Sequence, residues 1–336
     1  MKKNILVFCI RLSSFIQRDI DILKYYYNVR IIEFNIKEPK QFLSNFNYFL
    51  KSLFWANIYY SWFANYHSFF SAVVGKLLRK KTIIIVGGYD IEYVPEINYG
   101  LMNKKSPIYY LVKTTLFLSD IILPFSHYAY SKVLKIDPIF KNKMYPLFLS
   151  CDFEKYVPKN KKKNIVLTVC VIKRDNIKRK GLLTYINCAE LLPEINFYIV
   201  GKFLDDSIYR LRKNAPKNLI FTGFISEKQL IQLYQEAKVY AQLSYQEGEG
   251  GGGALGEAMA CECIPIVTNE AVSLKETVGD CGYYVSYNDV ENINQIIKVA
   301  LNDEVTGKKA RIRMINLFSR KNRQKDLYNV IENNYK

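Results

Sequence analysis

A chain of 336 residues, with 49% hydrophobic and 24% charged residues, is too apolar for intrinsic disorder and long enough for two domains. Its seven cysteines form no CxxC pair, which argues against a disulfide scaffold or a cysteine metal site and predicts reduced thiols in a cytoplasmic protein. The formal net charge of +17 favours anionic partners such as phosphorylated substrates, membrane lipid or nucleic acid, without choosing among them.

The first half of the chain alternates apolar runs of strand length with helical runs. The first apolar run follows Met1 almost at once, so we expect no signal peptide. Residues 52–75 carry no charged side chain and are long enough to span a bilayer. Their asparagine, serine and histidine residues favour a strand, a turn and a buried helix instead. The predicted strands of this half are Asn4–Ile10, Val29–Phe34, Ile58–Trp62, Thr82–Val86 and Ile121–Pro124.

The second half repeats this alternation after Pro158–Asn164, a polar and basic segment typical of a linker. Strands that alternate with helices form parallel βαβ units, so the sequence predicts two doubly wound α/β domains with a cleft between them. We expect a first domain over 1–157, a second over 158–315, and a C-terminal helix over 316–336 that crosses back to the first. The predicted strands of the second half are Ile165–Cys170, Asn196–Val200, Leu219–Phe221, Val239–Gln242, Ile264–Thr268 and Gly282–Val285.

The most informative segment is a glycine-rich run after the predicted strand Val239–Gln242. From residue 247 it reads EGEGGGGALGE, a turn of bare backbone that leads into a helical run. Backbone N–H groups at such a turn bind phosphate, and the carboxylates of Glu249 and Glu257 can accept hydrogen bonds from hydroxyls. A nucleotide sugar carries both kinds of group. The GxGxxG match at residues 248–253 is a weak dinucleotide signal, because Glu247 and Glu249 would face the pyrophosphate.

Charged residues also follow two other predicted strands. Lysines and arginines between Lys173 and Lys180 follow Ile165–Cys170, where they can clamp a diphosphate or form a solvated basic loop. Asp90 follows Thr82–Val86 and two glycines, where it can orient an acceptor or cap the next turn.

The remaining motifs favour structural roles. Asp19 and Asp21 spell DxD, a metal–diphosphate pattern, but they lie in a helical run, and we interpret them as a solvated face. His67 and His127 are too few for a metal cluster and are interpreted as structural residues. No metal site is therefore expected.

These residues resemble glycosyltransferase family 4, whose members are retaining enzymes of GT-B fold with two Rossmann-like domains that face a central cleft. The likeness covers the second half, while the first half matches only loosely, as expected of an acceptor-binding domain. The stretches that carry it are Ile165–Gly181, Leu191–Gly201, Phe221–Ser226, Ala237–Ser244, Glu257–Pro265 and Gly279–Tyr283.

The resemblance implies a donor site in the second domain. Glu249 would hold hydroxyls of the donor sugar, Glu257 the ribose, and Lys180 with Arg174 the diphosphate. Glu249, Lys180 and Asp90 are the expected catalytic residues. The register of the turn leaves Glu247 as the alternative to Glu249. The complete set expected at the donor is Arg174, Lys180, Gly223, Phe224, Glu247, Glu249, Gly250, Gly251, Gly252, Gly253 and Glu257.

By resemblance, the expected reaction is the metal-independent transfer of a sugar from a nucleotide diphosphate sugar to a hydroxyl of a glycan or lipid-linked acceptor, with no cofactor beyond this co-substrate. The rivals are a nucleotide-sugar epimerase, a dinucleotide oxidoreductase, and a non-catalytic basic protein that binds a membrane or RNA surface. The basic, aromatic first half is compatible with peripheral contact to the cytoplasmic membrane face. No RNA-binding signature is present, so no nucleic acid partner is expected.

Overall fold

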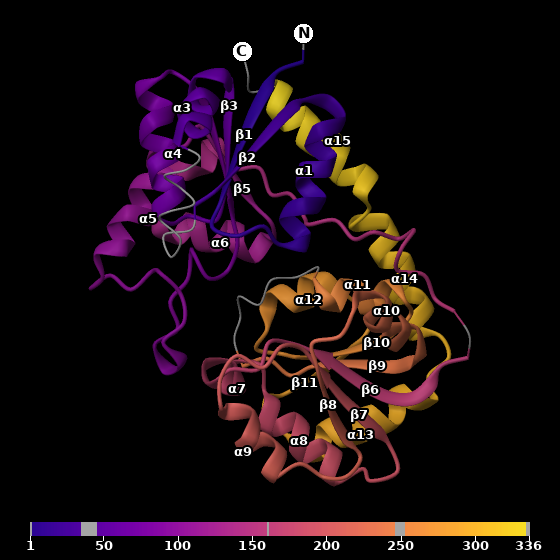
Figure 1. Cartoon of the computed structure of the whole chain (residues 1–336). Helices are drawn as coiled ribbons and strands as arrows, with labels where there is room; N and C mark the ends of the chain where they lie inside the picture. Colours follow the sequence, from indigo (N-terminus) through magenta and orange to yellow (C-terminus); the bar gives the residue numbers. More distant parts are fainter. Residues whose placement is uncertain (1, 35–45, 160, 246–252, 334–336) are drawn as a thin grey trace. The chain divides into compact units, whose positions relative to one another are not determined.

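The structure, a computed structural model, describes residues 2–34, 46–159, 161–245 and 253–333. The chain forms two compact units, and each is described by itself (Figure 1). Unit 1 comprises Met1–Ser150 and Arg320–Lys336, and unit 2 comprises Cys151–Ser319. The division at 150/151 precedes the segment Pro158–Asn164, whose last two residues already belong to a strand of unit 2.

In the described part of unit 1, five parallel strands form a sheet of order β2-β1-β3-β4-β5. All five were predicted, with ends that differ by one residue at most. Parallel strands need a crossover connection between them, and helices supply these crossovers. The strands are β1 (Asn4–Cys9), β2 (Asn28–Glu33), β3 (Ile58–Trp62), β4 (Lys81–Val86) and β5 (Ile121–Pro124).

Both faces of this sheet are buried, which is why its strands are apolar without interruption. In β1, Ile5 and Val7 point into a cluster on one face, and Leu6 and Phe8 into a cluster on the other. The helices that cover the faces are α1 (Ser14–Tyr26), α3 (Phe46–Trp55), α4 (Tyr66–Leu77), α5 (Pro107–Leu118), α6 (His127–Ile136) and α15 (Arg320–Asn333), with 3-10 turns η1 (Pro95–Ile97) and η2 (Pro138–Lys143).

The uncharged stretch at residues 52–75 forms the end of α3, β3, a turn and most of α4, as the strand–turn–helix interpretation predicted. Asn65 ends the turn with a capping box in which Ser68 bonds back to the backbone N–H of Asn65. Among the described residues, no helix is both long and apolar enough to cross a membrane.

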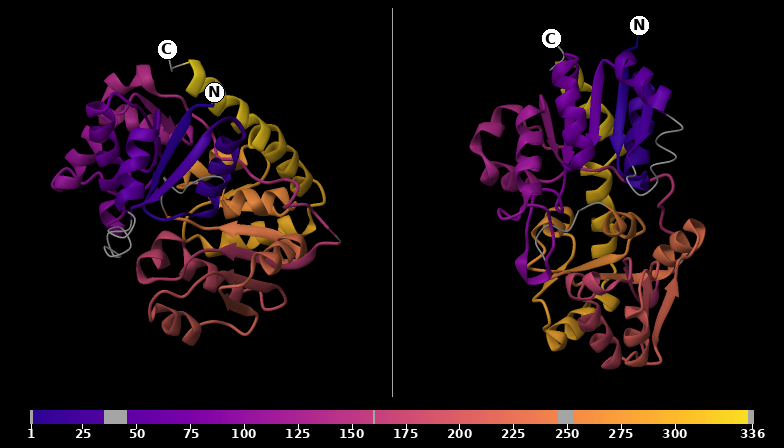
Figure 2. Two further views of the ribbon diagram at one scale, coloured as in Figure 1. Left: turned by 45° about the horizontal axis from the view of Figure 1, so that its top comes forward. Right: turned by 60° about the vertical axis from the view of Figure 1, so that its left-hand side comes forward.

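The C-terminal helix α15 packs on unit 1, beside the first segment of the chain (Figure 1 and Figure 2). Arg323 lies at the centre of this contact and is buried. Its guanidinium donates to both carboxylate oxygens of Asp19 on α1, with Nη2 2.7 Å from Oδ2, and Nη1 donates to the carbonyls of Leu147 and Phe148. Tyr60 donates its hydroxyl to the same carboxylate at 2.8 Å.

This network corrects the interpretation of Asp19 as part of a solvated face. Asp19 is buried, whereas Asp21 is exposed. The carboxylate can lie in the interior because a bidentate arginine compensates its desolvation. The partner follows Asp19 by 304 residues, so no local pattern could reveal it.

In the described part of unit 2, six parallel strands form a sheet of order β11-β10-β9-β6-β7-β8. Each overlaps a predicted strand. They are β6 (Lys163–Val169), β7 (Asn196–Val200), β8 (Leu219–Gly223), β9 (Ala237–Gln242), β10 (Ile264–Thr268) and β11 (Tyr283–Val285).

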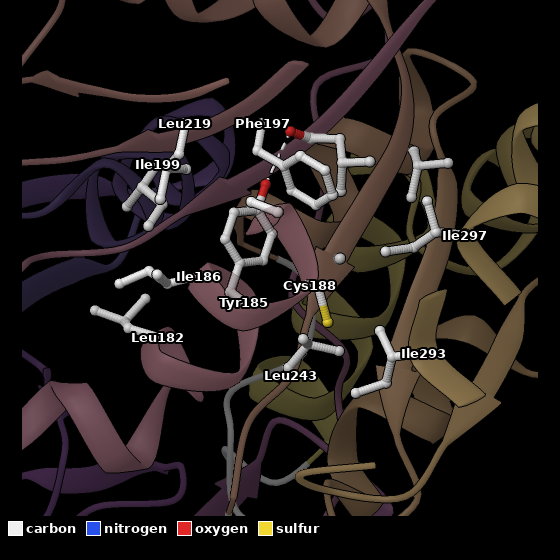
Figure 3. Close-up of a cluster of buried hydrophobic side chains, with 14 of the residues drawn as sticks. Leu182, Tyr185, Ile186, Cys188, Phe197, Ile199, Leu219, Leu243, Ile293 and Ile297 are labelled. Atoms are coloured by element: carbon white, nitrogen blue, oxygen red, sulfur yellow. Dashed lines mark hydrogen bonds between the residues drawn. The ribbon is translucent and has the colours of Figure 1, made fainter. Parts of the chain in front are cut away.

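Helices α8 and α13 pack on this sheet through a large apolar cluster. Figure 3 shows Tyr185 of α8 inside it, where its hydroxyl donates to the carbonyl of Val166 at 2.8 Å and so satisfies a buried polar group. The helices of unit 2 are α7 (Arg174–Arg179), α8 (Leu182–Glu190), α9 (Ser207–Lys213), α10 (Glu227–Glu236), α11 (Ala254–Ala260), α12 (Val272–Val278), α13 (Val290–Asn302) and α14 (Thr306–Leu317).

The helical C-terminal stretch divides between the two units. Helix α14 ends at Leu317 and belongs to unit 2, while α15 starts at Arg320 and belongs to unit 1. The chain passes between the units at 150/151 and again at 319/320. The two passing segments are hydrogen-bonded, because Cys151 donates its N–H to the carbonyl of Phe318 at 2.9 Å. The expected C-terminal helix over 316–336 thus begins as the last turn of α14.

Candidate functional site

The basic run after β6 contains a short helix, α7, whereas the sequence had left a solvated loop as one of two alternatives. Lys180 is its C-terminal cap residue, and Gly181 follows with a left-handed φ of +62°. A Cβ atom at Gly181 would lie 1.9 Å from the carbonyl oxygen of Leu243, at the end of β9. Only glycine permits this backbone approach, and the approach places Lys180 beside the chain that leads into the glycine-rich segment.

Tyr245 is held against the same helix. Its N–H donates to the carbonyl of Arg179 at 3.0 Å, and the ammonium of Lys178 lies 4.5 Å from the centre of its ring. The ring of Tyr287 packs edge-on against Tyr245 at 5.1 Å between centroids. Tyr287 in turn donates its hydroxyl to the carbonyl of Lys178 at 3.1 Å.

Glu270 completes this cluster, because both of its carboxylate oxygens lie 3.2 Å from the N–H of Tyr287. The cluster therefore fixes the chain at Tyr245 relative to Lys180. Tyr245, Tyr287 and Glu270 were not predicted from the sequence to have this role. The position of Tyr245 just before the glycines was a signal, whereas Tyr287 carried none.

The two cations expected at the diphosphate lie at opposite ends of α7. Six residues separate Arg174 from Lys180, which corresponds to roughly 9 Å along a helix and to different sides of it. Asp205 accepts a hydrogen bond from the backbone N–H of Arg174 at 2.8 Å. Hydrogen bonds from Ser207 and from this N–H lower the pKa of the Asp205 carboxyl, and the charge of Arg174 adds a smaller contribution. Lys173, the first cation of the same basic run, pairs with Asp175 at 3.0 Å on the surface.

A second group of expected donor ligands follows β7 and β8. Gly223 has a φ of +71°, and its carbonyl accepts the N–H of Gly201 at 3.1 Å, which joins the ends of the two strands. Phe224 comes next and is 72% exposed. The ammonium of Lys202 lies 4.5 Å from the centre of its ring. An exposed aromatic ring beside a cation offers a surface for a flat, electron-rich group.

Glu257, the expected ribose ligand, lies in α11 and is buried. Its Oε2 accepts the hydroxyl of Tyr234, a fully buried residue of α10, at 3.4 Å. Burial, followed by the charge of Glu257, raises the pKa of Tyr234. Gly253 immediately precedes α11 as its N-cap residue. The expected ligands Glu247, Glu249, Gly250, Gly251 and Gly252 lie outside the described residues.

Asp90 in unit 1 supports loops and does not face solvent. It is 1% exposed, with Oδ1 accepting the N–H of Gly87 and Oδ2 the N–H of Ala64, each at 2.9 Å. The carboxylate thus joins the loops that follow β3 and β4. Burial raises its pKa to about 6, and hydrogen bonds from the backbone oppose this shift. Both oxygens are occupied inside the protein, and the role expected of Asp90 at the acceptor stays a prediction.

The next acidic residue anchors the same loop from the other side. Glu92 is buried and accepts the hydroxyl of Tyr128, while the ammonium of Lys132 lies 3.2 Å from its Oε1. The loop then turns back, with paired backbone bonds between Val94 and Tyr99. Two buried carboxylates therefore fix a surface loop at the carboxyl end of β4.

His67 is a structural residue, as interpreted from the sequence. Its Nε2 lies 2.7 Å from the carbonyl of Trp62, and burial lowers its pKa to about 4. No group of three or more histidine, cysteine or acidic side chains within the described ranges is arranged to hold a metal ion.

The family model described as "Glycosyl transferases group 1" matches residues 152–317, which is nearly the whole of unit 2 and just under half of the chain. Among curated proteins, the O-antigen chain mannosyltransferase B of Escherichia coli is 31% identical over 102 residues, or 30% of this chain and 26% of the relative. An alpha-galactosylglucosyldiacylglycerol synthase of Streptococcus pneumoniae is 38% identical over 77 residues, or 21% of each chain. The chain thus spans about a quarter of these relatives or less.

Solved structures match over nearly the full length of the chain. A sucrose-phosphate synthase from Thermosynechococcus elongatus aligns with a TM-score of 0.73 at 16% identity, over 99% of both chains. The lipopolysaccharide outer core galactosyltransferase WaaB aligns with a TM-score of 0.69 at 12% identity, over 98% of this chain and 99% of the other. Together with the two parallel-sheet units, these matches show that the fold is GT-B.

Proposed function

We propose that this chain, whose residues 152–317 match the family model of the group 1 glycosyl transferases, transfers a sugar from a nucleotide diphosphate sugar to a hydroxyl acceptor. Transfer retains the anomeric configuration and needs no metal ion. Unit 2 binds the donor, and unit 1 binds the acceptor.

The observation that carries this proposal is the packing of Lys180 against the entrance of the glycine-rich segment. The close approach of Gly181 to Leu243 and the hydrogen bond from Tyr245 to Arg179 hold Lys180 beside the backbone that leads in sequence into the glycine-rich run. Both lie after parallel strands, at the edge of the sheet where α/β folds bind ligands. A fixed cation followed in the chain by glycines, which carry no side chain, suits the phosphates of a nucleotide.

The chemistry asked of this site is stabilisation of a leaving group. As the bond between the anomeric carbon and the diphosphate breaks and the bond to the acceptor oxygen forms, negative charge gathers on the diphosphate. Lys180 neutralises part of that charge without metal, and Arg174 adds a second cation if the donor extends past α7. A fixed cation at a developing charge lowers the barrier most when it needs no rearrangement, and the anchoring of α7 provides that rigidity.

Three further donor contacts complete the proposal. Phe224 stacks on the nucleobase, Glu257 binds the ribose, and Glu249 holds the donor sugar, with Glu247 as the alternative. Asp90 acts indirectly, by holding the loops of unit 1 to which an acceptor binds. Since the matched relatives are named for an O-antigen chain and a diacylglycerol lipid, a glycan or a glycolipid is the acceptor class. Peripheral contact with a membrane serves such an acceptor.

A thermal-shift panel of UDP-, GDP- and ADP-sugars with the full chain tests the donor proposal. We expect one class of nucleotide sugar to raise the midpoint temperature of thermal unfolding. EDTA should leave this shift unchanged, and NAD(H) should give no shift. The stabilising donor is then incubated with glycan acceptors, and NMR of the product reports whether its anomeric configuration matches the donor. No shift with any nucleotide sugar overturns the proposal. Conversion of the donor without an acceptor supports the epimerase instead.

A further inference from the structure

Four helices of unit 1 end at the same edge of its sheet. Helices α1, α3, α4 and α5 lead into β2, β3, β4 and β5, which all run in parallel. Each helix therefore ends where its strand begins (Figure 1). This edge lies opposite the carboxyl ends of the strands, where Asp90 and its loops are found.

Each of these four helices presents a large apolar side chain at its last or penultimate position. Tyr25 of α1 is 67% exposed, Phe54 of α3 66%, Leu77 of α4 76% and Phe117 of α5 62%. Single exposed apolar residues are ordinary in soluble proteins. Four large exposed apolar side chains along one edge are the pattern expected of a surface that binds a protein or a membrane.

A lysine ammonium accompanies three of these side chains. Lys2 donates to the carbonyl of Tyr25 at 3.1 Å, Lys80 to that of Phe54 at 3.1 Å, and Lys143 to that of Phe117 at 2.7 Å. The last carbonyls of a helix lack partners within it and carry partial negative charge, which lysine compensates. The same contacts fix positive charge beside each exposed apolar group.

The charge along this edge is mainly of one sign. Among the described residues, the acids at this edge are Asp120, which pairs with Lys76 at 2.6 Å, Glu332, which pairs with Lys3 at 2.6 Å, and Asp137, which caps the turn that carries Lys141 and Lys143, so the cations outnumber them. Burial lowers the pKa of Lys143 to about 8, with a smaller contribution from the nearby charge of Lys76 that the charge of Asp120 opposes. The basic residues of these segments are Lys2, Lys3, Lys24, Lys51, Lys76, Arg79, Lys80, Lys81, Lys141 and Lys143.

We propose that this basic-apolar edge, defined by Tyr25, Phe54, Leu77 and Phe117 with the cations just named, rests on an anionic lipid surface. Apolar side chains enter the boundary between headgroups and acyl chains, while lysines and arginines meet lipid phosphates. The purpose of this contact rests on the proposed function. The choice of an anionic lipid as the partner rests on the apolar and basic residues of the edge.

The position of the edge has a consequence for the acceptor. A strand of six residues is roughly 20 Å long, so the loops at the carboxyl ends of the strands stand about that far from the bound lipid. An acceptor hydroxyl must then lie well outside the bilayer, as at the growing end of a glycan. Membrane contact and turnover on a soluble acceptor are therefore separable.

Sedimentation with lipid vesicles tests the proposal with the full chain. We expect the protein to sediment with phosphatidylglycerol vesicles, to remain in solution with phosphatidylcholine vesicles, and to be released by salt. The triple variant F54S/L77S/F117S should bind phosphatidylglycerol at least about tenfold more weakly. Replacing three exposed cations, in K24Q/K51Q/R79Q, should weaken binding by roughly tenfold or more.

Matched controls come from unit 2. Y209S/V299S/I312S removes three exposed apolar groups, and K213Q/K217Q/K298Q removes three exposed cations. Both should bind vesicles like the parent chain. The inference is overturned if the parent stays in solution with phosphatidylglycerol, or if the edge variants bind no more weakly than their controls. Donor thermal shifts and transfer to a soluble acceptor, measured on the same variants, should stay unchanged and report separately on the proposed function.

Discussion

The two units use charged residues at their ligand-binding edges in opposite ways. In unit 2, Arg174 and Lys178 of α7 are exposed at the surface, near the backbone of Tyr245 that leads in sequence into the glycine-rich run. In unit 1, Asp90 and Glu92 lie inside the protein, where they bind backbone N–H groups, a tyrosine and a lysine. Exposed charge offers chemistry to a ligand, whereas buried charge fixes the geometry of loops. The difference supports the proposal that unit 2 supplies the reactive groups and unit 1 a rigid platform.

The buried pair of Arg323 and Asp19 is the strongest test of the positioning role of charge in unit 1. Replacing Arg323 with methionine leaves the buried carboxylate of Asp19 with the Tyr60 hydroxyl but without its counter-charge, and leaves two carbonyls without this donor. We expect the free energy of unfolding of unit 1 to fall by about 3–5 kcal/mol, measured by urea unfolding. R320M, which changes an exposed arginine in the same helix, should have little effect.

The double variant D19L/R323M separates charge burial from packing. Replacing both partners with apolar groups removes the uncompensated charge, so we expect much of the lost stability to return. A single R323M variant as stable as the parent would break the contrast between the units, because the buried charge of unit 1 would then fix nothing.

Lys180 tests the chemical role of charge in unit 2. We expect K180A to lower the rate of transfer by roughly 10²–10³-fold, the effect typical of losing one fixed group that stabilises developing charge. K180R should retain part of the activity, and K213A, on the surface of α9, should retain all of it. Near-normal transfer by K180A, measured by steady-state kinetics, contradicts the phosphate assignment.

Phe224 sharpens the donor side of the comparison. Stacking of a base on an aromatic side chain contributes about 1–3 kcal/mol, so F224A should bind the nucleoside diphosphate roughly tenfold more weakly by calorimetry. F224Y keeps the ring and should bind like the parent. Y209A removes an equally exposed aromatic of α9 and serves as the control. An unchanged dissociation constant for F224A removes Phe224 from the nucleobase site.

For Asp90 we expect a smaller effect on the free energy of unfolding, and one that depends on pH. Because its pKa rises from 3.8 to about 6 on folding, its contribution to stability is complete below pH 3.8 and is lost as the pH rises through 6. Between pH 5 and pH 7 this loss amounts to about 1 kcal/mol. The D90N variant should lack it.

The parent profile alone does not isolate this group, since His67 opposes it. The lowered pKa of His67, about 4, makes stability fall as the pH drops below 6.5. The useful quantity is therefore the difference in unfolding free energy between parent and D90N at each pH. A difference that stays constant from pH 5 to pH 7 argues that Asp90 does not titrate in this range.

Much of the fold could be predicted because its signals are local. The strands β3, β5, β7 and β10 have the bounds that the sequence predicted, since strands buried on both faces are apolar throughout. The polar residues in the stretch 52–75 correctly favoured a strand, a turn and a helix over a membrane span, because these signals too are local. Helix α7 was missed because six residues rich in lysine and arginine carry no apolar period.

The candidate site was less predictable. Lys180 was predicted because it follows a strand of a parallel sheet in a basic run, and Phe224 was predicted from the family resemblance; both roles stay predictions. Tyr287 was not predicted, because it acts through Tyr245 and Lys178, which lie far from it in sequence. Asp90 was found by position, but its inward orientation depends on Ala64 in another loop.

By itself, the sequence determined the alternation of strands and helices, the resemblance of the second half to a glycosyltransferase, the return of the C-terminal helix to the first domain, and the strand ends at which the candidate ligand-binding residues occur. The strand and helix signals depend on residues close together in the chain. Only the tertiary structure decided that Asp19 is buried, that the C-terminal stretch divides between α14 of unit 2 and α15 of unit 1, and that four helix ends form one basic-apolar edge. Such features arise where distant segments exclude water together, and the cost of burying or exposing a side chain is set by the neighbours that the fold supplies.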